Sequence, residues 1–378
     1  MPIEGAVEGM VEGTVEPRFA GVRDAFARSL AAGDDLGGSV CVIVEGEVAA
    51  DLWGGFQDRA KTLPWTRETL ACVYSSGKAV LSALILRAVS DGAMDYDAPL
   101  AHHYPGFDAH GKDVTLAQAL SHQHGVPGFA SEVDPGIWLD WDRCCAEIAA
   151  REPMWPPGTA SGYGPQVFGF VAGEALRRAT GQTYGAHLRS LGGDVLCGLG
   201  LSDATRVAPM AKPPRAPDLG EVTPATRAAF LEPWSAPSGV SRQAWAAAEI
   251  PGSNTHATAR GLAEIMQAFA TGRVHGEAWA SDAAREASWA ERISGPDRVL
   301  PFDLSYGAGI MRERPDAPQG PMFGGSPSAV GHYGFGGSCV VADPTRGLSF
   351  AYVPNKMSPD LVRDPRAVAL LDAMTNAF

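Results

Sequence analysis

The sequence lacks the features that mark several common protein classes. It has 30 lysine and arginine residues against 43 aspartate and glutamate residues, a formal net charge of −13, whereas a nucleic-acid binder needs a basic surplus to neutralise phosphates. No apolar run approaches the roughly 18 residues of a membrane span, and the acidic N-terminus lacks the basic-then-apolar layout of a secretory signal. We therefore expect a cytoplasmic protein that binds neither nucleic acid nor membranes, with a homo-oligomer left open.

Familiar metal, cofactor and nucleophile motifs are also missing. There is no H-E-x-x-H, no Walker phosphate loop and no Rossmann glycine fingerprint, and no G-x-S-x-G elbow of the α/β-hydrolases. No two cysteines have C-x-x-C spacing, so we expect reduced thiols that pack in the core rather than a disulfide framework or a zinc site. The six are Cys41, Cys72, Cys144, Cys145, Cys197 and Cys339. We expect no metal and no cofactor.

Predicted strands gather towards the two ends of the chain, and predicted helices lie between them. β-Branched residues on either side of a Glu-Gly-Glu turn predict a hairpin over 38–55, and a second hairpin is predicted over 339–353. A helix is predicted near 19–30, and a C-terminal helix begins at Asp364-Pro365. Apolar residues at helical spacing, each run followed by a glycine, predict further helices over 76–91, 166–180 and 258–271.

This order of elements predicts an α+β fold with two domains in 378 residues. Residues 18–72 plus 290–378 are expected to form an antiparallel sheet flanked by the N- and C-terminal helices. Residues 73–289 are expected to form an inserted, mostly helical domain, with the active site at the interface. We interpret residues 1–17, which repeat a Val-Glu-Gly theme, as a loosely docked arm. The Pro- and Trp-rich stretch over 203–254 is interpreted as a functional or cover loop.

The first chemical signal is Ser75-Ser76-Gly77-Lys78, at the predicted start of the helix over 76–91. A serine hydroxyl is a weak nucleophile at neutral pH and needs an adjacent base. Lys78 lies one helical turn after Ser75 on the same face, and a lysine can act as a base when burial or another cation lowers its pKa. By itself, the tetrapeptide is more often a helix cap followed by a surface lysine.

Further motifs occur around this tetrapeptide in a specific order and spacing. They are Trp53-Gly54-Gly55, Met94-Asp95-Tyr96, Leu120-Ser121-His122-Gln123-His124-Gly125, Pro157-Gly158-Thr159-Ala160-Ser161-Gly162-Tyr163 and Gly331-His332-Tyr333-Gly334-Phe335-Gly336-Gly337. With them, the chain from about residue 18 to 375 resembles the serine β-lactamase and penicillin-binding-protein superfamily. Within it, the chain looks most like the family VIII carboxylesterases, which have a class C β-lactamase-like fold. The resemblance implies a serine esterase that hydrolyses short-chain acyl esters, with a small-molecule ester as its partner.

The resemblance also implies catalytic roles for individual residues. Ser75 matches the acylated serine, Lys78 its lysine partner, and Tyr163 the general base that Lys78 keeps deprotonated. A phenol has a pKa of about 10 and needs a nearby ammonium to ionise at neutral pH. The backbone N–H groups of Ser75 and Phe335 would form the oxyanion hole. The alternative for Tyr163 is a loop tyrosine packed beside Pro157.

Two departures from the β-lactamase pattern matter for the substrate. Tyr163-Gly164-Pro165 has proline where β-lactamases have asparagine, so the side-chain amide that would bind the lactam is lost. His332-Tyr333-Gly334 replaces Lys-Thr-Gly, which helps to hold the drug's carboxylate. Both departures weaken the β-lactamase interpretation and leave the acyl-transfer residues intact. We assign substrate contacts to His332, Gly334, Trp155 and Trp234, although tryptophans are as often plain core residues.

Several alternatives stay open at this point. The same residues could serve a β-lactamase, a D-aminopeptidase or other amide hydrolase, or an acyltransferase. A non-catalytic scaffold derived from the superfamily is disfavoured because Ser75, Lys78 and Tyr163 are all present. His122 and His124 are interpreted as structural rather than as metal ligands, since no third ligand stands at a known spacing.

Overall fold

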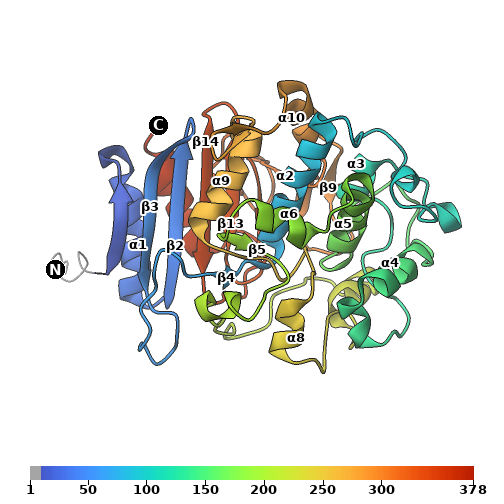
Figure 1. Ribbon diagram of the computed structural model, residues 1–378, viewed down its shortest axis with the longest axis horizontal. Helices are drawn as coiled ribbons and strands as arrows, with labels where there is room; N and C mark the ends of the chain where they lie inside the picture. The colour runs from blue at the N-terminus through green and yellow to red at the C-terminus, as the bar shows by residue number, and fades with distance from the viewer. Residues whose placement is uncertain (1–9) are drawn as a thin grey trace.

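A nine-stranded sheet dominates the computed structural model, which describes residues 10–378 (Figure 1). Its strand order is β1-β3-β2-β14-β13-β12-β11-β10-β9, and every neighbouring pair is antiparallel. The strands are β1 (Val11–Val15), β2 (Gly37–Val44), β3 (Glu47–Gly55), β9 (Ile293–Pro296), β10 (Asp303–Tyr306), β11 (Met311–Arg312), β12 (Val330–Tyr333), β13 (Cys339–Asp343) and β14 (Leu348–Pro354). Both predicted hairpins, β2–β3 and β13–β14, are confirmed, as is an α+β fold whose sheet is assembled from both ends of the chain.

The interpretation of residues 1–17 as a loosely docked arm is wrong for its second half. Residues 1–9 lie outside the described part of the chain. The five residues of β1 pair with β3 at the edge of the sheet, with Val11 opposite Gly54. Gly13 allows this close approach, because its φ is 107° and a Cβ there would lie 1.9 Å from the Asp51 carbonyl oxygen. The repeated glycine, which suggested a loose arm, therefore permits tight strand pairing.

Helices cover both faces of the sheet. On one face, α1 (Ala20–Ala32) and α11 (Pro365–Thr375) pack against each other, and on the other face α9 (Ala259–Ala270) packs on β2, β13 and β14. Alternate residues of β2 supply the two cores. Val40 and Val42 join the core under α1 and α11, while Cys41 and Ile43 join the core on the α9 side. Because successive side chains of a strand point to opposite faces, one buried strand serves both layers.

The remaining helices fall between residues 77 and 289. They are α2 (Gly77–Ser90), α3 (Leu116–Leu120), α4 (Trp141–Ala149), α5 (Val167–Thr180), α6 (Tyr184–Ser190), α7 (Pro224–Thr226), α8 (Arg242–Ala247) and α10 (Asp282–Trp289). Two small sheets lie in the same region, built from β4 (Ala71–Cys72), β5 (Val195–Leu196) and β6 (His256–Ala257), and from β7 (Arg273–Val274) and β8 (Glu277–Ala278). The helices predicted over 76–91, 166–180 and 258–271 are confirmed as α2, α5 and α9. The boundaries of the two domains stay a prediction.

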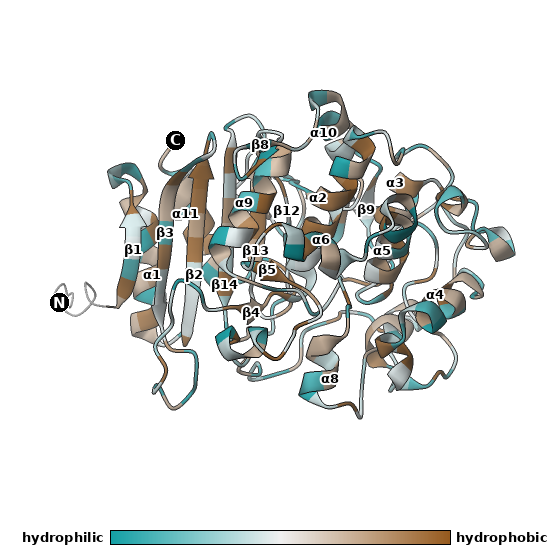
Figure 2. Cartoon of the chain, viewed as in Figure 1, coloured by the Kyte–Doolittle hydropathy of each residue, from teal (hydrophilic) through white to brown (hydrophobic). Residues whose placement is uncertain are grey.

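Helix α2 is a largely buried element that begins within the Ser75–Lys78 motif. It packs against α5 and α9, and Figure 2 shows hydrophobic residues along it and along the central strands. All six cysteines are free and buried, as expected, and burial raises the pKa of Cys72 to about 12. Within residues 10–378, no helix combines the length and the apolar character needed to cross a membrane.

Candidate active site

Ser75 lies in a short 3₁₀ turn, Tyr74–Ser76, that leads directly into α2. Tyr74 holds a left-handed backbone with φ 45°, a conformation that a bulky residue rarely adopts. Gly77 starts the helix where a Cβ would lie 2.5 Å from the Thr255 hydroxyl oxygen. One turn further on, the Nζ of Lys78 lies 2.9 Å from the Oγ of Ser75. The structure thus brings together the two residues that the sequence paired.

The amine of Lys78 is buried among neutral oxygen atoms. Its side chain is 0% exposed, and its Nζ donates to the carbonyl oxygens of Pro165 at 2.8 Å and Gly252 at 2.9 Å. Burial lowers the pKa of Lys78 well below its usual value. The Nζ also donates to the Oγ of Ser75; once the amine has lost a proton, its two remaining N–H groups can bind the two carbonyls and its lone pair can face Ser75. This geometry suits a group that accepts the serine proton.

Tyr163 precedes α5 and reaches the same two side chains. Tyr163 lines the same cavity as Ser75, and the Nζ of Lys78 lies 5.0 Å from the centre of the tyrosine ring. Burial raises the pKa of Tyr163, and the neighbouring Ser75 side chain opposes that rise only in part. Burial therefore favours the neutral phenol as well as the neutral amine. The resemblance implied a deprotonated tyrosine, so the direction of proton transfer within this trio needs a test.

His122 holds the loop that carries Tyr163. The N–H of Gly162 donates to the His122 carbonyl at 3.0 Å, and the N–H of Gly164 donates to its Nδ1 at 3.2 Å. The imidazole lies against the tyrosine, with ring centres 4.9 Å apart. Burial, followed by the charge of Lys78, keeps the pKa of His122 well below its usual value, so Nδ1 stays free to accept. This contact is the structural role that the sequence suggested, and it lies directly beside the predicted catalytic residue Tyr163.

Asp297 is a residue of the site that the sequence analysis missed. Its Oδ1 accepts the backbone N–H groups of Tyr163 at 3.0 Å, Val299 at 2.9 Å and Leu300 at 3.0 Å. Burial raises the pKa of the Asp297 carboxyl, and these hydrogen bonds counteract the rise. No motif surrounds Asp297, and 134 residues separate it from Tyr163 along the chain. Only the fold reveals that it anchors the tyrosine backbone.

The second predicted donor of the oxyanion hole, the Phe335 amide, belongs to a tight turn after β12. The N–H of Gly337 donates to the Gly334 carbonyl at 3.0 Å to close this turn. The Phe335 ring makes an edge contact with Tyr74, with ring centres 6.0 Å apart, and Ser75 and Phe335 line one cavity. The two residues therefore lie at one cavity, and the oxyanion hole formed by their amides stays a prediction.

A hydroxyl pair joins this turn to the segment that carries Ser75. Ser338 donates to the Val73 carbonyl at 2.8 Å, and its Oγ lies 2.9 Å from the Oγ of Ser76. Gly334 packs so closely here that a Cβ would lie 2.1 Å from the Val73 oxygen. Gly334 does not line the cavity, and its close packing serves contact within the chain; its assignment as a substrate contact stays a prediction.

Ser75 opens onto a cavity of about 380 Å³ whose wall is mainly apolar. Much of the wall comes from residues 216–236, within the irregular stretch that was interpreted as a cover loop. The larger apolar side chains in the wall are Leu219, Phe230, Leu231, Leu300, Met311, Phe335, Leu361 and Val362. The wall contains no Asp, Glu, Lys or Arg, and its polar side chains are Tyr74, Ser75, Tyr163, Gln166, Ser235, Ser253, His332 and Tyr333.

His332 lines the cavity in uncharged form. Its Nδ1 donates to the Tyr333 carbonyl at 2.7 Å. Burial, followed by the charge of Lys78, lowers the pKa of His332 to about 3. Near neutral pH this side chain therefore brings no positive charge to the position where β-lactamases have a lysine.

The two tryptophans assigned to the substrate do not line the cavity. Trp155 donates from Nε1 to the Ala160 carbonyl at 3.0 Å and packs behind the tyrosine loop, where a Cβ on Gly162 would lie 2.2 Å from its ring. Trp234 donates from Nε1 to the Phe129 carbonyl at 2.8 Å. Both indoles find buried carbonyl partners, as a large aromatic residue with one polar atom usually does. The assignment of Trp155 and Trp234 to the substrate gains no support from this cavity and stays a prediction.

Comparison with known proteins places this site in a family. The Beta-lactamase family model matches residues 22–373. The chain belongs to the Beta-lactamase family. Esterase/beta-lactamase LipL of Mycobacterium tuberculosis is 30% identical, over 94% of this chain and 86% of that protein. The resemblance inferred from the motifs is thus confirmed, and the protein is a hydrolase.

Solved structures of Beta-lactamase family members superpose closely on this chain. A penicillin-binding protein homolog from Caulobacter crescentus is 45% identical with a TM-score of 0.92, over 97% of this chain and 100% of that chain. A family VIII carboxylesterase is 34% identical with a TM-score of 0.88, also over 97% and 100%. The β-lactamase-like fold expected from the sequence is therefore confirmed.

Proposed function

We propose that this protein is a serine carboxylesterase that hydrolyses short-chain, uncharged acyl esters through an acyl-enzyme on Ser75. The observation that carries the proposal is the cavity beside Ser75, about 380 Å³ in volume and lined by apolar and neutral polar side chains. Its volume is at the small end of ligand pockets, which span about 300–1,000 Å³. The esterase named among the relatives and the family VIII carboxylesterase among the structures support the same substrate class.

In the proposed acylation step, the Oγ of Ser75 attacks the ester carbonyl carbon. The serine proton passes to the buried pair of Lys78 and Tyr163, and the amides of Ser75 and Phe335 stabilise the oxyanion. When the intermediate collapses, the bond from carbon to the alkoxy oxygen breaks. The pair returns the proton to that oxygen, so that a neutral alcohol leaves.

In the proposed deacylation step, water attacks the acyl-enzyme carbonyl. The same pair removes a proton from the water and returns it to the Oγ of Ser75, so that the carboxylic acid is released and the enzyme is restored. An alcohol in place of water would make the reaction an acyl transfer. The two activities therefore differ only in the acceptor.

A β-lactamase is the second candidate, because the relative LipL carries both activities in its name. Two positions argue against efficient lactam turnover. Pro165 presents only its carbonyl, which Lys78 already occupies, and His332 is uncharged. Each lost polar contact costs about 1–3 kcal/mol, so the two together amount to roughly one to four orders of magnitude in rate.

The test compares kcat/KM for p-nitrophenyl butyrate and nitrocefin on one preparation, with Ser75→Ala as the control. We expect the ester to be the better substrate by at least about tenfold, with short acyl chains from acetyl to hexanoyl preferred, and both activities to vanish in Ser75→Ala. Equal or better turnover of nitrocefin would replace the esterase proposal with the β-lactamase.

A further inference from the structure

The turn that presents the Phe335 amide is intrinsically flexible. Three of its four residues, Gly334, Gly336 and Gly337, are glycines, and the last two have φ values of 99° and 113°. Glycine has more backbone freedom to lose than any other residue. An amide donor stabilises an oxyanion well only when it is held in place before the reaction. Something outside the turn must therefore fix it.

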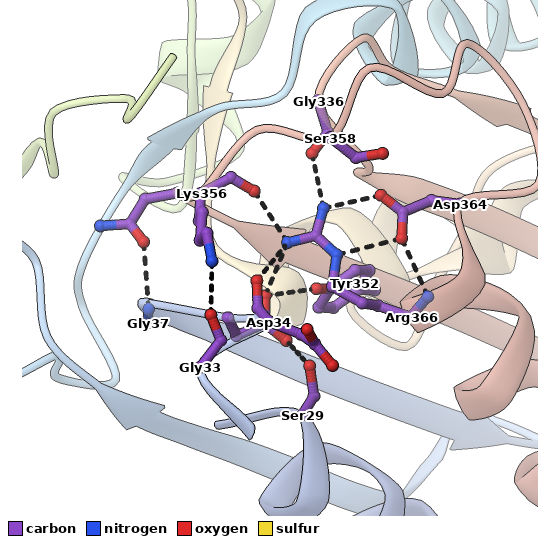
Figure 3. A network of polar contacts seen from close by, with 12 residues as sticks. Ser29, Gly33, Asp34, Gly37, Gly336, Tyr352, Lys356, Ser358, Asp364 and Arg366 are labelled. Atoms are coloured by element: carbon purple, nitrogen blue, oxygen red, sulfur yellow. Dashed lines mark hydrogen bonds and ion pairs between the residues drawn. The ribbon is translucent and has the colours of Figure 1, made fainter. Parts of the chain in front are cut away.

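The Gly336 carbonyl is one of the points at which the rest of the protein holds this turn, besides the contacts of Gly334 and Ser338 with Val73. Its oxygen accepts a hydrogen bond from the Nη2 of Arg366 at 2.9 Å and another from the N–H of Ser358 at 3.1 Å. Figure 3 shows the arginine pointing from the start of α11 towards this carbonyl. The Gly336 carbonyl lies two peptide groups after the Phe335 amide in the same four-residue turn, so these hydrogen bonds restrict the conformations open to that amide.

The guanidinium of Arg366 is itself fixed by buried carboxylates. Its Nη1 lies 3.0 Å from the Oδ1 of Asp35, and its Nη2 lies 2.6 Å from the Oδ2 of Asp364. Its Nη1 also donates to the Lys356 carbonyl at 2.7 Å, and Tyr352 donates to Asp35 at 2.6 Å. The Arg366 side chain is 9% exposed and both carboxylates are buried.

We propose that Arg366 is a positioning residue for the oxyanion hole, an inference that rests on the proposed function. Arg366 connects α11 and the loop after β14 to the Gly336 carbonyl through hydrogen bonds. These contacts hold the turn and thereby restrict the position of the Phe335 amide. The planar fork of an arginine meets Gly336, Asp35 and Asp364 at once. A lysine is a single point charge on a flexible stem and cannot span these three partners.

The experiment measures Arg366→Lys against a matched control, Arg285→Lys. Arg285 is also buried, pairs with Asp282 at 2.6 Å and donates to the Phe269 carbonyl at 3.0 Å. None of these three residues lines the cavity. One aliquot of each variant is labelled to completion with a fluorophosphonate to count functional sites, and an unlabelled aliquot is kept for the kinetics. Then kcat and KM for p-nitrophenyl butyrate are measured per labelled site, together with Tm.

We expect both variants to lose Tm, and only Arg366→Lys to lose kcat per labelled site. Loss of an oxyanion donor costs about 10²–10³ in kcat, so a donor that is displaced rather than removed should cost about 10- to 100-fold. KM should change by less than about threefold, because the contact matters in the transition state. A purely structural arginine would lower Tm and the number of labelled sites while leaving kcat per site unchanged.

An unchanged kcat per site in Arg366→Lys overturns the inference and leaves the proposed function intact. A wild-type protein that does not hydrolyse the ester refutes the proposed function instead. Should Arg366→Lys fail to fold, the double variant Asp364→Asn, Arg366→Gln decides by the same criterion. It removes one charge of each sign, and asparagine can still cap α11.

Discussion

Removal of Lys78 and Tyr163, singly and together, tests whether they act as one proton-transfer unit. Lys78→Met keeps most of the buried volume and removes the amine that lies 2.9 Å from Ser75. Tyr163→Phe keeps the ring and removes the hydroxyl. A positioned acid–base group contributes about 10²–10⁴-fold to rate. If the two groups acted independently, their rate losses would multiply, and the double variant would be slower by about 10⁴–10⁸-fold. We expect the double variant to fall within about tenfold of the slower single variant, since members of one unit lose rate non-additively.

The pH profile identifies which member of the pair accepts the serine proton. An acceptor must be unprotonated, so activity should rise with pH as Lys78 loses its proton and then level off. Burial lowers the pKa of Lys78, which places the plateau well below the value of about 10.4 for a free lysine. Lys78→Met should lose this rise, whereas Tyr163→Phe should keep it at a lower rate.

The assay is hydrolysis of p-nitrophenyl butyrate across pH, with Tm measured for every variant to confirm folding. If the rate loss of the double variant equals the product of the two single losses, Lys78 and Tyr163 do not act as one proton-transfer unit. If Tyr163→Phe retains more than about a tenth of the wild-type rate, the tyrosine is not the base. The amine of Lys78 would then carry the proton alone.

Three further predictions follow from the site and its surroundings. A fluorophosphonate should label Ser75 alone, and mass spectrometry that finds the adduct on Ser76 would contradict the assignment. Phe230→Ala should widen the cavity and raise the kcat/KM ratio of p-nitrophenyl octanoate to butyrate by about tenfold, whereas an unchanged ratio would exclude this wall from acyl selection. Glu313→Ala should cost about 3 kcal/mol of stability and leave kcat per labelled site unchanged, because the carboxylate accepts the N–H groups of Met322 and Phe323 at 2.8 and 2.7 Å. Thermal unfolding checks this, and an unaltered Tm would refute it.

Local patterns predicted most of the elements correctly. The hairpin turn predicted at 45–47 is found at Glu45-Gly46, between β2 and β3, and Gly181 ends α5 with φ 74°. Asp364 accepts the N–H of Arg366 as the cap of α11. Each of these features depends on residues close together in the sequence, so that propensity, turn geometry and capping determine it. The prediction of a loose arm at β1 failed because an edge strand depends on a partner strand that is distant in the sequence, and no pattern within β1 itself shows that pairing.

The sequence by itself determined the nucleophile and its lysine, since a helix places residues three apart on one face whatever the rest of the fold. It also supplied the motif that contains Tyr163, and with it the family. The tertiary structure alone decided what surrounds them. Asp297 binds the backbone of Tyr163, which is 134 residues away in the sequence, and Arg366 binds the carbonyl of Gly336, which is 30 residues away. Trp155 and Trp234 show most plainly what sequence alone does not decide, because a tryptophan side chain suits a substrate pocket and a hydrophobic core equally well. Which of the two they line depends on long-range packing, and no local pattern encodes that choice.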